Sequence, residues 1–409
     1  MFRRTLTTAL RTAVAAASSA NTTTQALVNS AVPLVSVRTR FSDVGLPPKP
    51  KAARFDNRQK LVFPETPNFQ GMTIPLKQPS KTKMSVSKVY ANVNANQPRE
   101  YWDYENAELV YGEQDSYEAI SKLGTGKYSE VFAGVNSITN QPVVLKVLKP
   151  ARKNRIRREV KVLQLLRGGP NIAQFVEIVR DPEWQVNTIV TEYAPGQDYK
   201  KVFPTLSADD IKYYMYEVLR GLDYAHSHGI MHRDIKPGNL VIDTQSRSVR
   251  IIDWGLAEFY HPYTEYNVRV ATRHFKAPEL LLDMTDYDYS VDMWSFGCVL
   301  AGLIFRLHPV FKGPSVDLLR IAEIFGSEPI HAYMKKYSLK FNSSYDGIFS
   351  ADTHIEGKGL QSLINDSNRD LATAEALDLL SKLLVIDHQE RLTAKQAMAH
   401  PYFAGVHKQ

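Results

Sequence analysis

Cysteine is almost absent from this sequence, since Cys298 is the only one among 409 residues. A single cysteine cannot form an internal disulfide, which excludes the disulfide-stapled secreted proteins and favours a cytosolic, nuclear or mitochondrial-matrix setting. Long apolar runs are absent too, because no stretch approaches the roughly 18 uninterrupted apolar residues that span a bilayer. The sequence therefore predicts a soluble protein without a membrane segment.

Acidic residues are missing from the first part of the chain. Residues 1–42 contain five arginines and no aspartate or glutamate, and they are rich in Ala, Ser and Thr. A helix there would place Phe2 and Leu6 on one face and Arg4 and Arg11 nearly opposite. This composition is typical of a mitochondrial or plastid transit peptide, so we predict a mitochondrial protein. A disordered tail without a targeting function is the alternative.

Residues 43–88 carry nine basic and three acidic side chains in clusters rich in Pro and Lys. They show little apolar periodicity, and we interpret them as a flexible, disordered linker. The net charge of +7 therefore resides in the N-terminal part of the chain, and the rest is mildly acidic. This distribution argues against a specific nucleic-acid partner.

Apolar patterning that indicates ordered structure begins near Val89 and continues to Phe403. Residues 117–148 alternate and are rich in β-branched side chains, which indicates antiparallel strands. Helical spacing follows, and we expect helices over residues 155–166, 211–226, 292–306, 315–324, 374–384 and 393–399. The sequence thus predicts an α+β fold with two lobes, a small β-rich N-lobe with one main helix (117–194) and a large α-helical C-lobe (195–403). A segment of residues 89–116 precedes these lobes, and a short tail (404–409) follows them.

A predicted hairpin in the small lobe contains Gly124 and Gly126, whose missing side chains would let the backbone lie over phosphate groups. Ser129 stands where the third glycine of this pattern is expected, so the loop alone could be an ordinary turn. Lys146 ends the strand after the hairpin, and Glu159 opens the next helix. This order is that of a lysine that contacts nucleotide phosphates and its glutamate partner. A surface ion pair is the alternative interpretation.

The segment from His232 to Asn239, which we call the catalytic loop, is a more specific sign of one chemistry than the glycine-rich hairpin. In it Asp234 would orient the attacking hydroxyl, Lys236 would steady the transferring phosphoryl group, and Asn239 would hold a magnesium ion. Asp253 follows an apolar strand at a glycine turn and is the expected second Mg²⁺ ligand. A polar surface turn does not need this spacing, so the pattern predicts phosphoryl transfer from ATP.

The remaining predicted positions surround this catalytic set. The activation segment is the stretch that begins at Asp253, and Ala277-Pro278-Glu279 would close it. Glu279 would pair with Arg391. Asp292 would support the backbone of the catalytic loop. We expect the nucleotide to contact the glycine-rich loop, the strands beside Lys146 and the catalytic loop, at Gly124, Thr125, Gly126, Lys127, Tyr128, Ser129, Val131, Val144, Lys146, Glu192, Ala194, Asn239, Val241, Ile252 and Asp253.

Three segments carry a more particular resemblance: PREYWDYE at residues 98–105, GKYSEVF at 126–132 and DWGLAEFYHP at 253–262. In the last of them Trp254 occupies a position where most kinases have Phe. With these segments the chain resembles the catalytic (alpha) subunit of casein kinase II, from about Val89 to Phe403.

The resemblance implies a constitutively active serine/threonine kinase that phosphorylates sites followed by acidic residues and uses GTP as well as ATP. The segment Tyr101 to Glu105 and the residues upstream would hold the activation segment open. A dimeric regulatory (beta) subunit would bind the outer face of the small lobe near Phe132 and Val147, giving an alpha2-beta2 tetramer. Members of the family reside mainly in nucleus and cytoplasm, which is the alternative to a mitochondrial location.

Acidic protein substrates would meet basic side chains on the first helix and near the activation segment. These are Arg152, Lys153, Arg155, Arg157, Arg158, Arg269, Arg273 and Lys276. Such charge complementarity gives selection and steering more than affinity. A solvated helix face or a nucleic-acid patch is the alternative for residues 152–158.

The chain also departs from the family. Asn154 interrupts a run of lysines, Gly238 replaces a histidine, and Thr191 stands where the family has a bulky phenylalanine. These changes affect substrate range and the back of the nucleotide pocket rather than the catalytic set. A pseudokinase scaffold is the alternative function, but such proteins usually lack the catalytic lysine or one of the two aspartates, and all three are intact here. A small-molecule kinase would lack the long activation segment.

Overall fold

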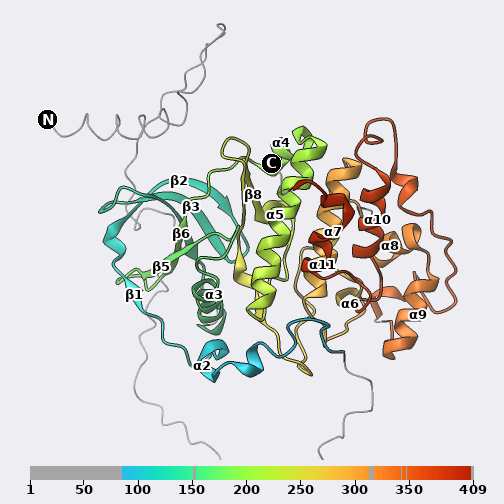
Figure 1. Cartoon of the computed structure of the whole chain (residues 1–409). Coiled ribbons are helices and arrows are strands. Elements are labelled where there is room, and N and C mark those ends of the chain that lie inside the picture. Colours follow the sequence, from blue (N-terminus) through green and yellow to red (C-terminus); the bar gives the residue numbers. More distant parts are fainter. Residues whose placement is uncertain (1–84, 151–152, 313–316, 342, 347, 407–409) are drawn as a thin grey trace, which may run out of the picture. The chain divides into compact units, whose positions relative to one another are not determined.

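The computed structural model describes residues 85–150, 153–312, 317–341, 343–346 and 348–406 (Figure 1). All of them belong to one compact unit. The predicted transit peptide and residues 43–84 of the predicted linker lie outside the described residues. Ser85 and Lys88, at the end of that predicted linker, form hydrogen bonds with the C-lobe, so residues 85–88 pack on the folded domain and are not part of a flexible linker.

The N-lobe is built on a six-stranded sheet in the order β1-β5-β6-β4-β3-β2. Neighbouring strands are antiparallel except β1 and β5, which are parallel. The strands are β1 (Tyr111–Gly112), β2 (Tyr117–Thr125), β3 (Ser129–Asn136), β4 (Pro142–Leu148), β5 (Phe175–Arg180) and β6 (Asn187–Glu192). The predicted helix is α3 (Lys153–Leu165), which buries Ile156, Val160 and Leu163 at helical spacing.

The C-lobe is mainly helical. Its helices are α4 (Tyr199–Val202), α5 (Ala208–Ser227), α6 (Pro278–Leu281), α7 (Ser290–Phe305), α8 (Asp317–Phe325), α9 (Glu328–Tyr337), α10 (Ala374–Leu383) and α11 (Ala394–Met398). Two small antiparallel sheets accompany them, β7 (Ile230–Met231) with β10 (Glu258–Phe259) and β8 (Leu240–Asp243) with β9 (Ser248–Ile251). Every residue of α7 is buried, so this helix forms the centre of the lobe. None of the described helices is long and apolar enough to cross a membrane.

The predicted α+β fold with two lobes is confirmed, and each predicted helix is present with its described ends within three residues of the prediction. The start of α5 is fixed by a capping box, in which Ser207 and Asp210 exchange hydrogen bonds between side chain and backbone. The sequence reading missed α9, whose pattern is interrupted by Pro329 and by paired lysines at its end. It also missed the short helix α2 (Arg99–Trp102) before the N-lobe.

Candidate active site

The glycine-rich loop is the turn between β2 and β3. The backbone N–H of Gly126 donates to the carbonyl of Ser129 at 2.8 Å, which closes the turn. Lys146 lies in β4, and its Nζ is 2.5 Å from Glu159 Oε1 and 2.6 Å from Asp253 Oδ1. The predicted lysine and its helix partner are therefore in contact, and the predicted metal ligand is beside them.

Charge coupling among these three groups is strong. Burial opposes the charge of Lys146, but the carboxylates of Glu159 and Asp253 raise its pKa above the ordinary value. In return the Lys146 ammonium lowers the pKa of Asp253 to about 2. Lys146 and Asp253 are thus ionised at neutral pH, which suits a site that receives phosphate oxygens and a cation.

The catalytic loop gathers around the carboxylate of Asp234. Lys236 Nζ lies 2.7 Å from Asp234 Oδ2, and the amide nitrogen of Asn239 donates to the Asp234 carbonyl at 2.8 Å. Thr272, from the activation segment, donates to Asp234 Oδ1 at 2.7 Å and accepts a hydrogen bond from Lys236 at 2.9 Å. The aspartate is therefore held in one orientation by neighbours from two parts of the chain.

Asp292 supports this loop from beneath, as predicted. It is fully buried, and its two carboxylate oxygens accept the backbone N–H groups of His232 and Arg233 at 2.8 and 2.7 Å. His226 contributes a third hydrogen bond at 3.0 Å. Arg233 has the unfavourable φ of 65°, so these contacts hold a backbone conformation that a free loop would avoid.

Other predicted nucleotide residues lie on β4, β6 and β8 or just after β6 and β9. Val144 pairs with Thr191 across β4 and β6, and the next residue, Glu192, forms an ion pair with Arg250 at 3.0 Å. A bridge between Gln197 and Ile242 joins the segment after β6, which contains Ala194, to strand β8, which carries Val241. The Ile252 N–H donates to the Asn239 carbonyl, so this hydrophobic position adjoins the catalytic loop.

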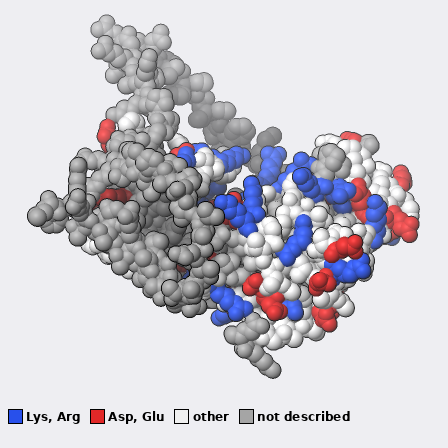
Figure 2. Space-filling view, turned by 90° about the horizontal axis from the view of Figure 1, so that it is seen from above, with Lys and Arg blue, Asp and Glu red and all other residues white. Residues whose placement is uncertain are grey.

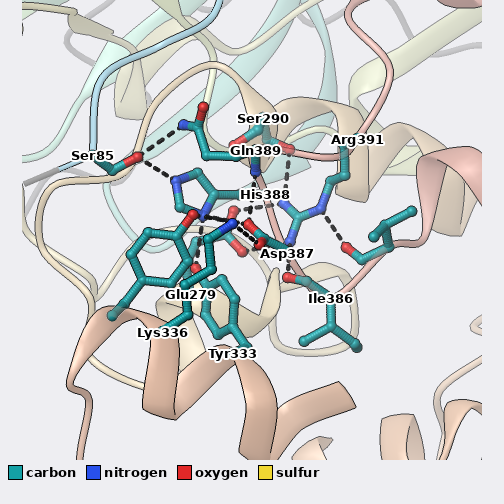
Figure 3. Close-up of polar contacts among 12 residues, drawn as sticks. Ser85, Glu279, Ser290, Tyr333, Lys336, Ile386, Asp387, His388, Gln389 and Arg391 are labelled. Carbon is teal, nitrogen blue, oxygen red and sulfur yellow. Dashed lines mark hydrogen bonds and ion pairs between the residues drawn. The ribbon is translucent and has the colours of Figure 1, made fainter. Parts of the chain in front are cut away.

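The activation segment ends in a buried ion pair, which Figure 3 shows in close-up. Arg391 donates to both oxygens of Glu279 at 2.6 and 2.7 Å, and both side chains are 0% exposed. The predicted pairing is thus present as a bidentate contact. The start of the chain reaches the same region, because Ser85 Oγ is 2.6 Å from His388 Nε2, and His388 Nδ1 is 2.8 Å from the hydroxyl of Tyr333.

The activation segment begins with a second carboxylate that the sequence reading missed. Glu258, in β10, forms ion pairs with Arg158 of α3 and with Arg233 of the catalytic loop. Its side chain is 13% exposed. This contact joins the N-lobe helix, the catalytic loop and the activation segment.

The residues predicted to bind acidic substrates do not form one free surface. Arg158 faces Glu258, Arg157 donates to the backbone carbonyl of Glu105, Arg273 pairs with Asp317, and Lys276 donates to the carbonyl of Val270. Arg155 stacks on Tyr128. Lys153 and Arg269 are exposed, and Arg152 lies outside the described residues. Most of these cations therefore hold parts of this chain together.

Thr272 and Glu258 were both absent from the prediction. A threonine in a loop has no distinctive spacing, although Thr272 stands five residues before the Ala277-Pro278-Glu279 motif. Glu258 lies inside the segment that carries the family resemblance, but the sequence does not show which arginines approach it.

The site combines an ordered Lys-Glu pair, an aspartate held next to a lysine and an asparagine in the catalytic loop, and a second aspartate at the start of the activation segment. This combination is that of a phosphotransferase site. Residues 117–403 match the family model of the protein kinase domain, and this chain belongs to that family. As a member it transfers phosphoryl groups with ATP as co-substrate.

Protein kinases usually act with Mg²⁺, and the side chains present suit this ion. Asp253 supplies a carboxylate, and the nitrogen of the Asn239 amide is taken up by Asp234, which leaves the amide oxygen as the coordinating atom. One carboxylate and one amide oxygen, completed by phosphate oxygens and water, match the preference of Mg²⁺. Gly255 leaves space beside these carboxylates, because a Cβ at this position would lie 3.3 Å from Asp253 Oδ1 and 3.1 Å from Glu159 Oε2.

Proposed function

We propose that this chain is a serine/threonine kinase of the casein kinase II type that needs no phosphate on its activation segment. The observation that carries the proposal is the position of the Glu258 carboxylate between Arg158 and Arg233. In many kinases arginines take up a phosphate that is added to the activation segment and orders it. Here a carboxylate that is always present occupies that role.

The surroundings of Arg233 support this interpretation. Its guanidinium donates to the Leu256 carbonyl at 2.7 Å and to the hydroxyl of Tyr287 at 2.9 Å, besides the contact with Glu258. Groups of this chain therefore satisfy the hydrogen bonding and the charge of the buried arginine, so it does not require an added phosphate as a partner.

The N-terminal segment supports it as well. Asn94 donates to the carbonyls of Gly229 and Tyr260 at 2.8 and 2.9 Å. The ring of Tyr104 stacks on Phe259 at 6.1 Å, and the ring of Trp102 meets His261 edge-on at 4.6 Å. These contacts pack residues 94–104 on the first part of the activation segment, where they favour one conformation of it.

The arrangement at Asp234 supports a serine or threonine acceptor. Thr272 brings the activation segment within hydrogen-bond distance of the catalytic carboxylate, which favours a short hydroxyl side chain over the longer phenol of tyrosine. Asp234 would orient the hydroxyl and accept its proton, and Lys236 would stabilise the charge on the transferring group. Lys146 would hold the α- and β-phosphates of ATP, or of GTP if that nucleotide is also used, and Mg²⁺ would neutralise phosphate charge.

Selection of acidic substrates would depend on a few cations. Figure 2 shows Lys and Arg side chains next to Asp and Glu side chains on the described part of one face, so that face has charges of both signs. Arg273 is exposed as well, but it pairs with Asp317. We therefore assign the selection to two other exposed members of the predicted set, Lys153 and Arg269, together with Arg152. Such contacts steer substrates and select among them.

A regulatory subunit would bind the N-lobe at different side chains from those predicted. Phe132 and Val147 are each only 8% exposed and belong to the small core of that lobe. Ile120 and Leu123 of β2 are about half exposed and would offer the apolar contact instead. We keep the alpha2-beta2 assembly and the mitochondrial location as proposals that follow from the family resemblance and from the leader composition.

The first experiment compares two peptides, one with Glu at the positions after its serine and one with Lys there. We expect transfer from Mg·ATP to the acidic peptide, unchanged after phosphatase treatment of the enzyme, and no transfer by Asp234→Asn, which keeps the fold. Equal use of both peptides would contradict the acid-directed assignment. Loss of activity after phosphatase treatment would contradict the role of Glu258. Nucleotide binding without turnover would identify a scaffold.

A further inference from the structure

The tip of the glycine-rich loop rests on helix α3. The guanidinium carbon of Arg155 lies 3.5 Å from the centre of the Tyr128 ring, which is van der Waals contact. Tyr128 is 42% exposed, so the ring lies on the helix surface and is not buried in the core. This contact links the glycine-rich loop to helix α3.

Other bonds hold the loop near its two ends. Lys149 Nζ donates to the carbonyl of Gly126 at 3.0 Å, and the backbone N–H of Lys149 donates to the carbonyl of Tyr128 at the same distance. These bonds come from the end of β4 and leave the direction of the Tyr128 side chain open. The Arg155 stack is the contact that directs this side chain towards α3.

Arg155 is one helical turn before Glu159, so the two side chains leave the same face of α3. Glu159 holds Lys146, while Arg155 holds the loop tip. Both residues line one cavity with Gly126, Tyr128, Lys146 and Asp253. One face of α3 therefore positions the phosphate-binding lysine and the loop that covers the phosphates.

We propose that Arg155 is a positioning residue for nucleotide binding, which holds the glycine-rich loop closed by stacking on Tyr128, and that it does not serve to bind acidic substrates. An arginine suits this role better than a lysine because its planar, weakly hydrated guanidinium stacks on an aromatic face. Hydrogen bonds from Lys127 and then Arg155 also lower the pKa of the Tyr128 phenol, in agreement with cations at the loop tip. The inference rests on the proposed kinase function.

The test measures the dissociation constant of a non-hydrolysable Mg·ATP analogue by displacement of a fluorescent nucleotide. Arg155→Lys keeps the charge and loses the planar stack, and Tyr128→Ala removes the ring. We expect each to weaken binding by about two- to fivefold, the range of a partly exposed cation–π contact. The double variant should be no weaker than the single ones, because both remove the same contact. Lys161→Gln, which changes a cation on another face of α3, should leave binding unchanged.

Two results would overturn the proposal. One is wild-type nucleotide affinity in Arg155→Lys and Tyr128→Ala, with a raised KM for the acidic peptide in Arg155→Gln, since this would return Arg155 to substrate binding. The other is full additivity in the double variant. Thermal unfolding of each variant shows whether the fold is intact. If the kinase proposal itself fails, the wild-type protein will not bind the analogue, which is a distinct outcome.

Discussion

The two ends of the activation segment are each held by a glutamate and arginine, in very different surroundings. At the far end Glu279 and Arg391 are fully buried and form two parallel hydrogen bonds. At the near end Glu258 is partly exposed and is shared by Arg158 and Arg233, which come from different lobes. One pair lies within the C-lobe, and the other contact crosses between the lobes.

This difference separates a structural role from a functional one. The buried pair is part of the C-lobe core, where removal of one partner alone would leave an unpaired buried charge. The Glu258 contact fixes the position of α3 relative to the catalytic loop. We expect both lobes to keep their cores when this contact is lost. We therefore expect substitutions at the far end to change stability, and substitutions at the near end to change activity.

The largest effect should follow from Glu279→Gln. The change leaves the Arg391 charge buried without its partner, which typically destabilises a protein by about 3–5 kcal/mol. Urea denaturation should show a clear fall in the free energy of unfolding.

A matched double substitution sharpens this prediction. Glu279→Leu with Arg391→Met removes both charges, and replacing a buried pair by apolar side chains is often neutral. We expect the double variant to be more stable than Glu279→Gln. A double variant that is less stable than Glu279→Gln would contradict this, because the ion pair itself would then contribute to the free energy of unfolding.

Glu258→Gln should have its main effect on turnover. A neutral amide cannot compensate two guanidinium groups, so the active arrangement of α3 and the activation segment becomes less populated. We expect kcat to fall by about tenfold, equivalent to about 1.4 kcal/mol. The midpoint of thermal unfolding should change little, and a large drop in it with normal kcat would reverse the comparison between the two ends.

Ser85→Ala tests the contact of the N-terminal chain with the far end. The hydroxyl pairs with His388 Nε2 and accepts a hydrogen bond from Gln389 at 2.8 Å. Gln389 also donates to the Val86 carbonyl, so removal of the hydroxyl mainly deprives Nε2 of the buried His388 of its partner. We expect a loss of about 1 kcal/mol in stability. Ser246→Ala, in an exposed turn, provides the control.

The smallest effect concerns pH at the near end. Burial lowers the pKa of His261, which lies against Trp102, and the carboxylate of Glu258 only partly opposes this. A histidine with a depressed pKa in the folded state contributes stability above its ordinary value of about 6.5. That contribution is lost as the pH falls below this value. The stability difference between wild type and His261→Gln should therefore shrink between pH 7.5 and 5.5, and a constant difference would contradict the assignment.

Sequence reasoning could predict the candidate catalytic groups because their spacing is typical of one chemistry. Lys146 lies in strand β4, Asp234 and Asp253 follow the strands β7 and β9, and the structure brings the lysine and Asp253 together. The helix around Cys298 was equally clear, since a wholly buried helix is mostly apolar, as residues 296–305 are.

The basic residues of α3 were harder to assign. A run of cations shows charge but not direction, and Arg155, Arg157 and Arg158 leave the helix towards three different partners. Each partner is distant in sequence, so only the folded chain identifies it. The same holds for Thr272, whose role depends on how close the activation segment comes to Asp234.

The hydrogen bond of Lys88 with the Arg391 carbonyl has a practical consequence for limited proteolysis. The family match begins at Tyr117, yet a piece that started there would lack Ser85, Asn94 and the other residues that cover the C-lobe. Trypsin should cut slowly after Lys88, because this lysine side chain is engaged and its neighbour Ser87 is buried. The stable fragment that remains after digestion should therefore retain Ser85.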